Sequence, residues 1–207
     1  MTPPPRSCIM RPIGAARIVR ALALAGGVAA VGVAVARPSV RELDAALFAD
    51  VNAGHGPAAD RLFSEVTELG SLYAAGAAAG ALVLLGRRRA GTRALTAAVA
   101  TWAAGQALKK LVDRPRPYLD DAAGTRRMIA EPAGTSWPSS HPAVLTAFTR
   151  VAARELTLGR TSRAGLTGLD LAVATSRVYL GVHYPSDVVG GLLLGRSVAA
   201  IWPSRRA

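Results

Sequence analysis

The chain has 207 residues, enough for one domain. It is 51% hydrophobic and only 18% charged, with a mean hydropathy of +0.28, which excludes an ordinary soluble domain and predicts a membrane protein. The net charge of +12 could suggest a nucleic-acid partner, but the arginines form short clusters between apolar runs and no nucleic-acid-binding motif surrounds them. We therefore expect a bilayer around this chain and no nucleic acid. The single Cys8 excludes an internal disulfide and a cysteine-based metal site.

Apolar runs predict an all-α fold, a polytopic membrane bundle of about six transmembrane helices in one domain over residues 21–202. A basic, disordered cytoplasmic tail is expected at 1–20 and a short cytoplasmic tail at 203–207. Several runs are shorter than the ~20 residues that a bilayer requires, so residues at the rim would complete them. The first run could also be a cleaved signal peptide, because its last residues fit a cleavage site. The six runs cover residues 21–36, 70–86, 94–108, 142–158, 166–182 and 188–202.

Residues 37–69, between the first two runs, are polar, with apolar side chains recurring every three to four positions. This period predicts amphipathic helices lying on the membrane surface. His55, between two glycines in this segment, is interpreted as a loop histidine without a functional role.

Charge predicts the orientation of the chain in the cell (inner) membrane. With a cytoplasmic N-terminus, the arginine clusters at 87–93 and 160–163 and both termini lie inside. The loop at 109–137 lies outside although it holds six basic and four acidic residues, and we attribute its excess of positive charge to function. This topology places three polar motifs together on the outer face.

The three motifs are KKLVDRPRP, PSSH and SRVYLGVHYPSD, which occupy residues 109–117, 138–141 and 176–187. Ser139 or Ser140 can cap a helix that has Pro142 in its first turn, and Pro185 can open the last helix. Helix N-termini carry free N–H groups and a positive dipole end, which favour an anion. Positively charged side chains beside them would stabilise a phosphoryl group; they are Lys109, Arg116 and Arg177.

The two histidines of these motifs allow a division of labour. His183 would attack phosphorus as the nucleophile, and Asp187, four residues later, would orient its imidazole. His141 would then protonate the leaving oxygen and activate water. Carboxylates are not spaced for a metal ion, and the cations can do its work, so we expect metal-independent chemistry without a cofactor.

At these residues the chain resembles the type 2 phosphatidic acid phosphatase superfamily, the lipid phosphate phosphatases, whose pattern is K-x6-RP, PSGH and SR-x5-H-x3-D. The resemblance implies an acid phosphatase/haloperoxidase-like helical core and the catalytic roles assigned above. Ser140 stands where the family has glycine, which would be costly if the backbone there were left-handed but not if its N–H alone is needed. The resemblance implies that the phosphate is held by Lys109, Arg116, Ser139, Ser140 and Arg177.

The resemblance also implies a lipid phosphate or prenyl (di)phosphate substrate: phosphatidate, phosphatidylglycerophosphate, a prenyl diphosphate or a prenyl-phosphoryl sugar phosphate. The sequence selects none of these and does not indicate an oligomeric state. Two alternatives stay open, a phospholipid- or anion-binding membrane protein without turnover and the haloperoxidase branch of the superfamily, whose members are large and soluble. Beyond the family pattern, we predict a contact between Arg150 and Asp170 in adjacent spans, because charges at that depth usually pair. The alternative, equally open, is that Arg150 reaches the membrane surface by itself.

Overall fold

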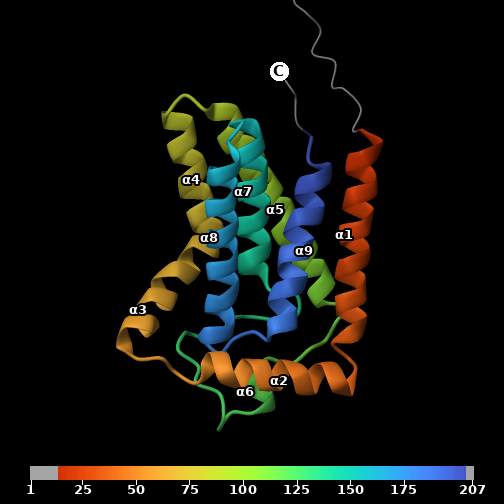
Figure 1. The fold of residues 1–207 in the computed structure, drawn as a ribbon, viewed down its shortest axis with the longest axis vertical. Helices are drawn as coiled ribbons and strands as arrows, with labels where there is room; N and C mark the ends of the chain where they lie inside the picture. Colours follow the sequence, from red (N-terminus) through yellow and green to blue (C-terminus); the bar gives the residue numbers. More distant parts are fainter. Residues whose placement is uncertain (1–13, 204–207) are drawn as a thin grey trace, which may run out of the picture.

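A computed structural model describes residues 14–203, which form helices and connecting loops without a strand (Figure 1). In chain order the helices are α1 (Ala15–Ala34), α2 (Pro38–Asn52), α3 (Pro57–Val66), the 3-10 helix η1 (Thr67–Gly70), α4 (Leu72–Leu84), α5 (Arg88–Lys109), α6 (Pro117–Asp120), α7 (Ser140–Glu155), α8 (Arg160–Tyr179) and α9 (Pro185–Ile201). All six predicted apolar runs are helical, so the all-α fold is confirmed.

The first helix begins earlier than the sequence suggested. α1 starts at Ala15 rather than at residue 21, so residues 15–20, expected in the disordered tail, belong to a helix. The expectations for residues 1–13 and 204–207, including Cys8, concern positions outside the described part of the chain.

Length and apolarity qualify one helix of residues 14–203, α1, as a membrane span by itself. The segment from α3 through η1 qualifies only together with α4, and the two are bent by 66°. α7 does not qualify, and its environment explains why: it is buried from Pro142 to Thr149 and again from Val151 to Ala153. Because its side chains face other helices, α7 needs less apolar surface than a helix that faces lipid.

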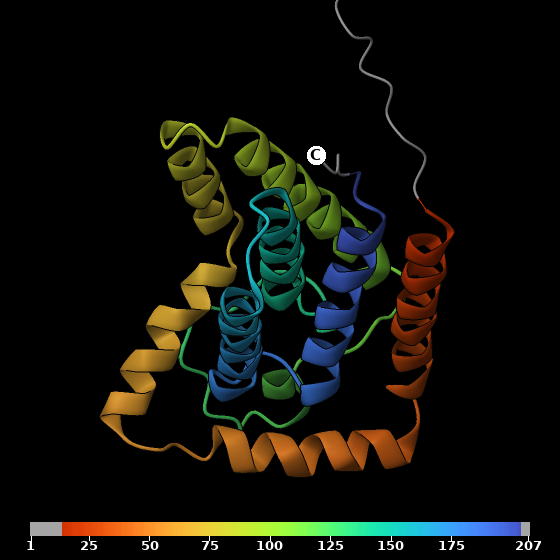
Figure 2. The same cartoon turned by 45° about the horizontal axis from the view of Figure 1, so that its top comes forward.

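α7 is the central helix and packs against α4, α5, α8 and α9, while α1 packs on the outer side of α9. α2 lies across one end of the bundle, as both views show (Figures 1 and 2). The prediction of helices within 37–69 is confirmed by α2 and α3, and their position on a membrane surface stays a prediction.

α7 and α9 approach closely because α9 carries glycine on the face toward α7. A Cβ atom at Gly191 would lie 2.3 Å from the Ser139 carbonyl oxygen, and one at Gly195 would lie 2.4 Å from that of Ala143. Small residues at a spacing of four allow helix backbones to meet in this way. The contact holds the first turns of α7 and α9, which carry the second and third polar motifs, next to each other.

Candidate active site

The eight predicted site residues lie at the end of the bundle that α2 crosses (Figure 1). α5 and α8 end there with Lys109 and Arg177, and α7 and α9 begin there. His183 lies in the loop between α8 and α9, and Arg116 in the loop that follows α5. The Ser139 N–H donates to the Asp187 carbonyl at 3.0 Å, which joins the starts of α7 and α9.

Asp187 is held in one orientation by three donors. It is the third residue of α9, and its Oδ2 accepts the N–H of Tyr184, the residue before the helix, at 2.8 Å. This backward bond from the third helical position satisfies a free helix N–H. The same oxygen accepts the Ser136 hydroxyl, while Oδ1 accepts Arg114 Nη1 at 2.8 Å. These three bonds fix the orientation of the carboxylate independently of His183.

His183 is buried between a carboxylate and a guanidinium. Its Nδ1 lies 3.5 Å from Asp187 Oδ2 and 3.4 Å from Ser136 Oγ, and its Nε2 lies 3.3 Å from Arg116 Nη1. A proton on Nδ1 faces the carboxylate and leaves the Nε2 lone pair on the side of Arg116. Burial, then the positive charges of Arg116, Arg177 and Lys109, lower the pKa of His183 well below its ordinary value of 6.5. The imidazole is neutral at pH 7 and can act as a nucleophile.

The three cations around His183 lack carboxylate partners among residues 14–203. Arg116 donates to carbonyl groups at 2.9–3.3 Å, and Lys109 donates to the carbonyls of Thr135 and Ser136. Arg177 donates to Thr67 Oγ1 at 2.8 Å, and its buried Nε has no partner. Buried positive charge without a counterion is costly, so this end of the bundle is suited to an anion.

The PSSH motif begins α7, and some of its polar side-chain groups have no hydrogen-bond partner within 14–203. Ser139 is the N-cap by position, yet its buried Oγ has no hydrogen-bond partner. His141, the second helical residue, packs against Gly70, where an added Cβ would lie 2.8 Å from the His141 Cβ. No hydrogen bond within 14–203 engages its imidazole. Ser140 has helical backbone and accepts Gln106 Nε2 at 3.3 Å, so this position does not require the glycine of the family pattern.

Three further residues belong to this network although the sequence did not single them out. Ser136 bonds Asp187, and Arg114 joins Asp187 to Asp44, whose Oδ2 lies 2.7 Å from Arg114 Nη2. Asp44 also accepts the Ser186 N–H at 2.9 Å, which ties α2 to the start of α9. The sequence holds one signal for Asp44. It recurs at a spacing of four with Phe48 and Asn52, so all three share a helix face, and these are the buried positions of α2.

The predicted direct contact between Arg150 and Asp170 is wrong. No ion pair within 4.0 Å joins them in the described part of the chain. Arg150 Nη2 donates to Thr167 Oγ1 at 3.3 Å, and Asp170 accepts Thr149 Oγ1 at 3.1 Å. The two side chains line one small cavity between α7 and α8, where threonine hydroxyls satisfy each of them in place of a direct pair.

Comparison with known proteins identifies the class. Residues 90–206, more than half of the chain, match the PAP2 superfamily, and they contain all three polar motifs. The chain belongs to the PAP2 superfamily.

Two groups of relatives match in sequence. The decaprenylphosphoryl-5-phosphoribose phosphatase of Mycobacterium tuberculosis is 38% identical over 128 residues, 59% of this chain and 64% of the relative, so the match covers less than two thirds of that protein. Its namesake in Mycolicibacterium smegmatis is 36% identical, over 63% of this chain and 68% of the relative. The putative undecaprenyl-diphosphatase YbjG of Escherichia coli is 36% identical, over 44% of this chain and 46% of the relative.

Two solved structures share the fold. The transmembrane PAP2-type phosphatidylglycerolphosphate phosphatase of Bacillus subtilis superposes with a TM-score of 0.71 at 21% identity, covering 86% of this chain and 92% of that one. Aquifex aeolicus LpxE superposes with a TM-score of 0.67 at 25% identity, covering 77% and 93%.

Proposed function

We propose that this chain hydrolyses the phosphate group of a membrane lipid through a phosphohistidine intermediate, without a metal ion. One observation carries the proposal: the neutral His183 imidazole lies between an oriented carboxylate and an arginine that has no carboxylate partner within 14–203. A phosphoryl group bound to Arg116 would be next to Nε2, the nitrogen that can attack. The alternative, an anion-binding protein without turnover, does not account for this arrangement of a nucleophile with its orienting acid.

The reaction proceeds in two steps. His183 Nε2 forms a bond to phosphorus as the bond to the lipid oxygen breaks, and His141 donates a proton to that oxygen. Asp187 stabilises the charge that develops on the imidazole. His141 then removes a proton from water, whose oxygen displaces the histidine and releases inorganic phosphate. Lys109, Arg116 and Arg177, with the N–H groups at the start of α7 and the Ser139 and Ser140 hydroxyls, hold the phosphoryl oxygens throughout.

For the substrate, we favour a prenyl-phosphoryl sugar phosphate or a prenyl diphosphate among the four classes. The support comes from the relatives matched in sequence, which are named as a decaprenylphosphoryl-sugar phosphatase and a putative undecaprenyl-diphosphatase. The substrate's tail would stay in the bilayer while its phosphate enters the site from the membrane surface.

For the topology, we propose six spans, with both termini cytoplasmic and the site on the outer face of the cell membrane. The helices assigned to the spans have 20, 13, 22, 16, 20 and 17 residues. The short α4 would cross with the help of the bent segment before it. Arginine clusters lie at the end of the bundle opposite the site, as the positive-inside rule requires.

Phosphate release from purified protein tests the function. Detergent-solubilised chain would be given each of the four lipid classes in excess chelator, beside His183→Ala and His141→Ala. We expect release that persists in chelator and falls by at least ~10³-fold in His183→Ala. We also expect ³²P from labelled substrate to accumulate on the protein in His141→Ala, because its second step lacks the base. Equal release by His183→Ala would overturn the nucleophile assignment, and no release from any lipid would favour the binding protein.

A further inference from the structure

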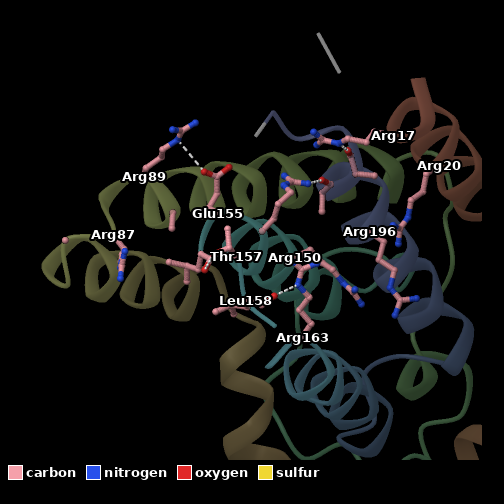
Figure 3. Close-up of a pocket in the computed structure, with 16 residues that line it drawn as sticks. Arg17, Arg20, Arg87, Arg89, Arg150, Glu155, Thr157, Leu158, Arg163 and Arg196 are labelled. Atoms are coloured by element: carbon pink, nitrogen blue, oxygen red, sulfur yellow. Dashed lines mark hydrogen bonds and ion pairs between the residues drawn. The ribbon is translucent and has the colours of Figure 1, made fainter. Parts of the chain in front are cut away.

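The bundle has a second polar hollow, at the end opposite the candidate active site. It has a volume of about 1460 Å³ and lies where α7 and α9 end and where α1, α5 and α8 begin. Arg154 in its wall follows His141 by 13 residues along α7, so the two sites are about 20 Å apart. We call this hollow the arginine cavity; arginines line it from five segments, namely Arg17, Arg20, Arg87, Arg89, Arg150, Arg154, Arg163 and Arg196 (Figure 3).

Positive charge in the arginine cavity is almost unopposed. Glu155 is the one carboxylate in its lining, and it is shared by Arg89 at 3.4 Å and Arg93 at 3.5 Å. Asp170, behind Arg150, would still leave the arginines in large excess. Residues 1–13 and 204–207 contain no aspartate or glutamate, so their side chains supply no counter-charge either.

Some of these arginines support the fold. Arg17 Nε donates to the Ala200 carbonyl at 2.9 Å, and Arg154 donates to the carbonyls of Ala199 and Trp202 at 2.8 and 2.9 Å. They satisfy free carbonyl groups at the end of α9 and complement its negative dipole end. Arg163 Nε donates to the Leu158 carbonyl at 2.8 Å, in the loop between α7 and α8.

Others have no such use. Arg20, Arg87 and Arg196 make no hydrogen bond or ion pair within 14–203, and the Arg196 Nε is buried without a partner. Arg89 and Arg163 do have partners, but they stand in the first turns of α5 and α8, where the helix dipole disfavours a cation. Helix capping therefore explains part of the cluster, and the positive-inside rule explains its side of the membrane. Neither explains why unpaired guanidiniums converge on one hollow.

We propose that the arginine cavity binds a phosphate-bearing anion with more than one phosphate group. Guanidinium groups bind phosphate oxygens in pairs, and half-buried arginines gain most from such a counterion. The hollow opens to the surface and, at about 1460 Å³, has room for an anion larger than a single phosphate. Two sources share this chemistry: a diphosphatidyl lipid headgroup of the facing leaflet, and a soluble di- or polyphosphate.

Binding to a double variant tests the proposal. Arg20→Gln with Arg196→Gln removes two cavity charges and no hydrogen bond within 14–203, so the protein should remain folded. The matched control is Arg88→Gln with Arg160→Gln, which removes two charges at the same end from residues that do not line the cavity. Cardiolipin retained from phosphatidylcholine nanodiscs would be counted by native mass spectrometry, and inorganic pyrophosphate binding would be followed by calorimetry in neutral detergent.

We expect the cavity variant to bind at least one ligand about tenfold more weakly than the control variant does. A difference for cardiolipin alone identifies the leaflet lipid, a difference for pyrophosphate alone identifies a soluble ligand, and a difference for both supports a general phosphate site. Equal binding by the two variants for both ligands would overturn the proposal. Cardiolipin is a phosphodiester, which a phosphomonoesterase does not hydrolyse, and lipid phosphate release is assayed separately. A failure of the proposed activity would therefore leave this result intact.

Discussion

His183 and Arg116 together set the electrostatics of the site at the scale of single residues. The imidazole is buried, and three cations without carboxylate partners in the described chain surround it, which keeps it neutral. The same cations that we propose hold the phosphate would therefore keep the proposed nucleophile neutral. The negative charge of Asp187 lies beside Nδ1, and the positive charge of Arg116 lies beside Nε2. The two ring nitrogens therefore have opposite electrostatic environments.

The pH dependence of kcat/KM follows from this arrangement. In the proposed mechanism neutral His183 is the reactive form, so the acid limb of the profile should lie at its lowered pKa, below 6.5. Arg116→Gln removes one cause of the lowering, and the acid limb should move up by about 1 pH unit. Arg116→Lys keeps the charge and should leave the limb in place although both variants bind substrate less well. Profiles from pH 4 to 9 check this; coincident limbs for Gln and Lys would contradict it.

At the scale of elements, the pairing of α7 with α9 positions the site. α7 supplies Ser139 and His141, α9 supplies Asp187, and glycine on α9 sets their separation. α2 adds a second constraint, because Asp44 holds both Arg114 and the start of α9. The site thus depends on contacts between helices more than on any one loop.

Gly191→Ala tests this dependence. Its Cβ would lie 2.3 Å from the Ser139 carbonyl oxygen, so α9 must move away from α7. We expect a loss of about 1–3 kcal/mol in stability, seen as a lower Tm in detergent, and a fall in phosphate release. The control is Gly80→Ala in α4, where nothing lies within 4 Å of the added Cβ and the change should be neutral or slightly stabilising. Similar Tm values for the two variants would show that the close approach is not required.

At the scale of the whole molecule, the two ends of the bundle differ in chemistry. One end holds the histidines and the oriented Asp187, and the other holds the arginine cavity about 20 Å away. This difference supports the proposed orientation, in which the arginine-rich end would face the cytoplasm.

Thiol labelling in intact cells checks the orientation. Leu119 in α6 is 64% exposed at the active-site end, and in the sequence Cys8 precedes α1, whose first turns lie at the arginine-rich end. A membrane-impermeant maleimide should label Leu119→Cys in a Cys8→Ser background, while Cys8 of the unaltered chain should react only after permeabilisation. The reverse pattern would mean that the site faces the cytoplasm.

The six apolar runs and three polar motifs were readable from the sequence because each is local. An apolar run in a bilayer forms a helix because its backbone groups find no other partners there, and proline and serine mark where α7 and α9 begin. Since all three motifs sit at helix ends, an alternating topology brings them to one end of the bundle. The family pattern, Lys109 to Asp187, falls within the part that matches the PAP2 superfamily.

Only the tertiary structure determined which partners the buried charged side chains have. Arg114 meets Asp44 and Asp187, which are 70 and 73 residues away, and the first of these contacts depends on the placement of α2 across the bundle. Arg150 and Asp170 lie on adjacent helices as the sequence suggested, but nearby threonines bond them instead of each other. The arginine cavity likewise draws on five segments. Sequence patterns determine which residues share a helix end, whereas the packing of helices determines which side chains meet, because that depends on distances of a few ångströms between distant segments.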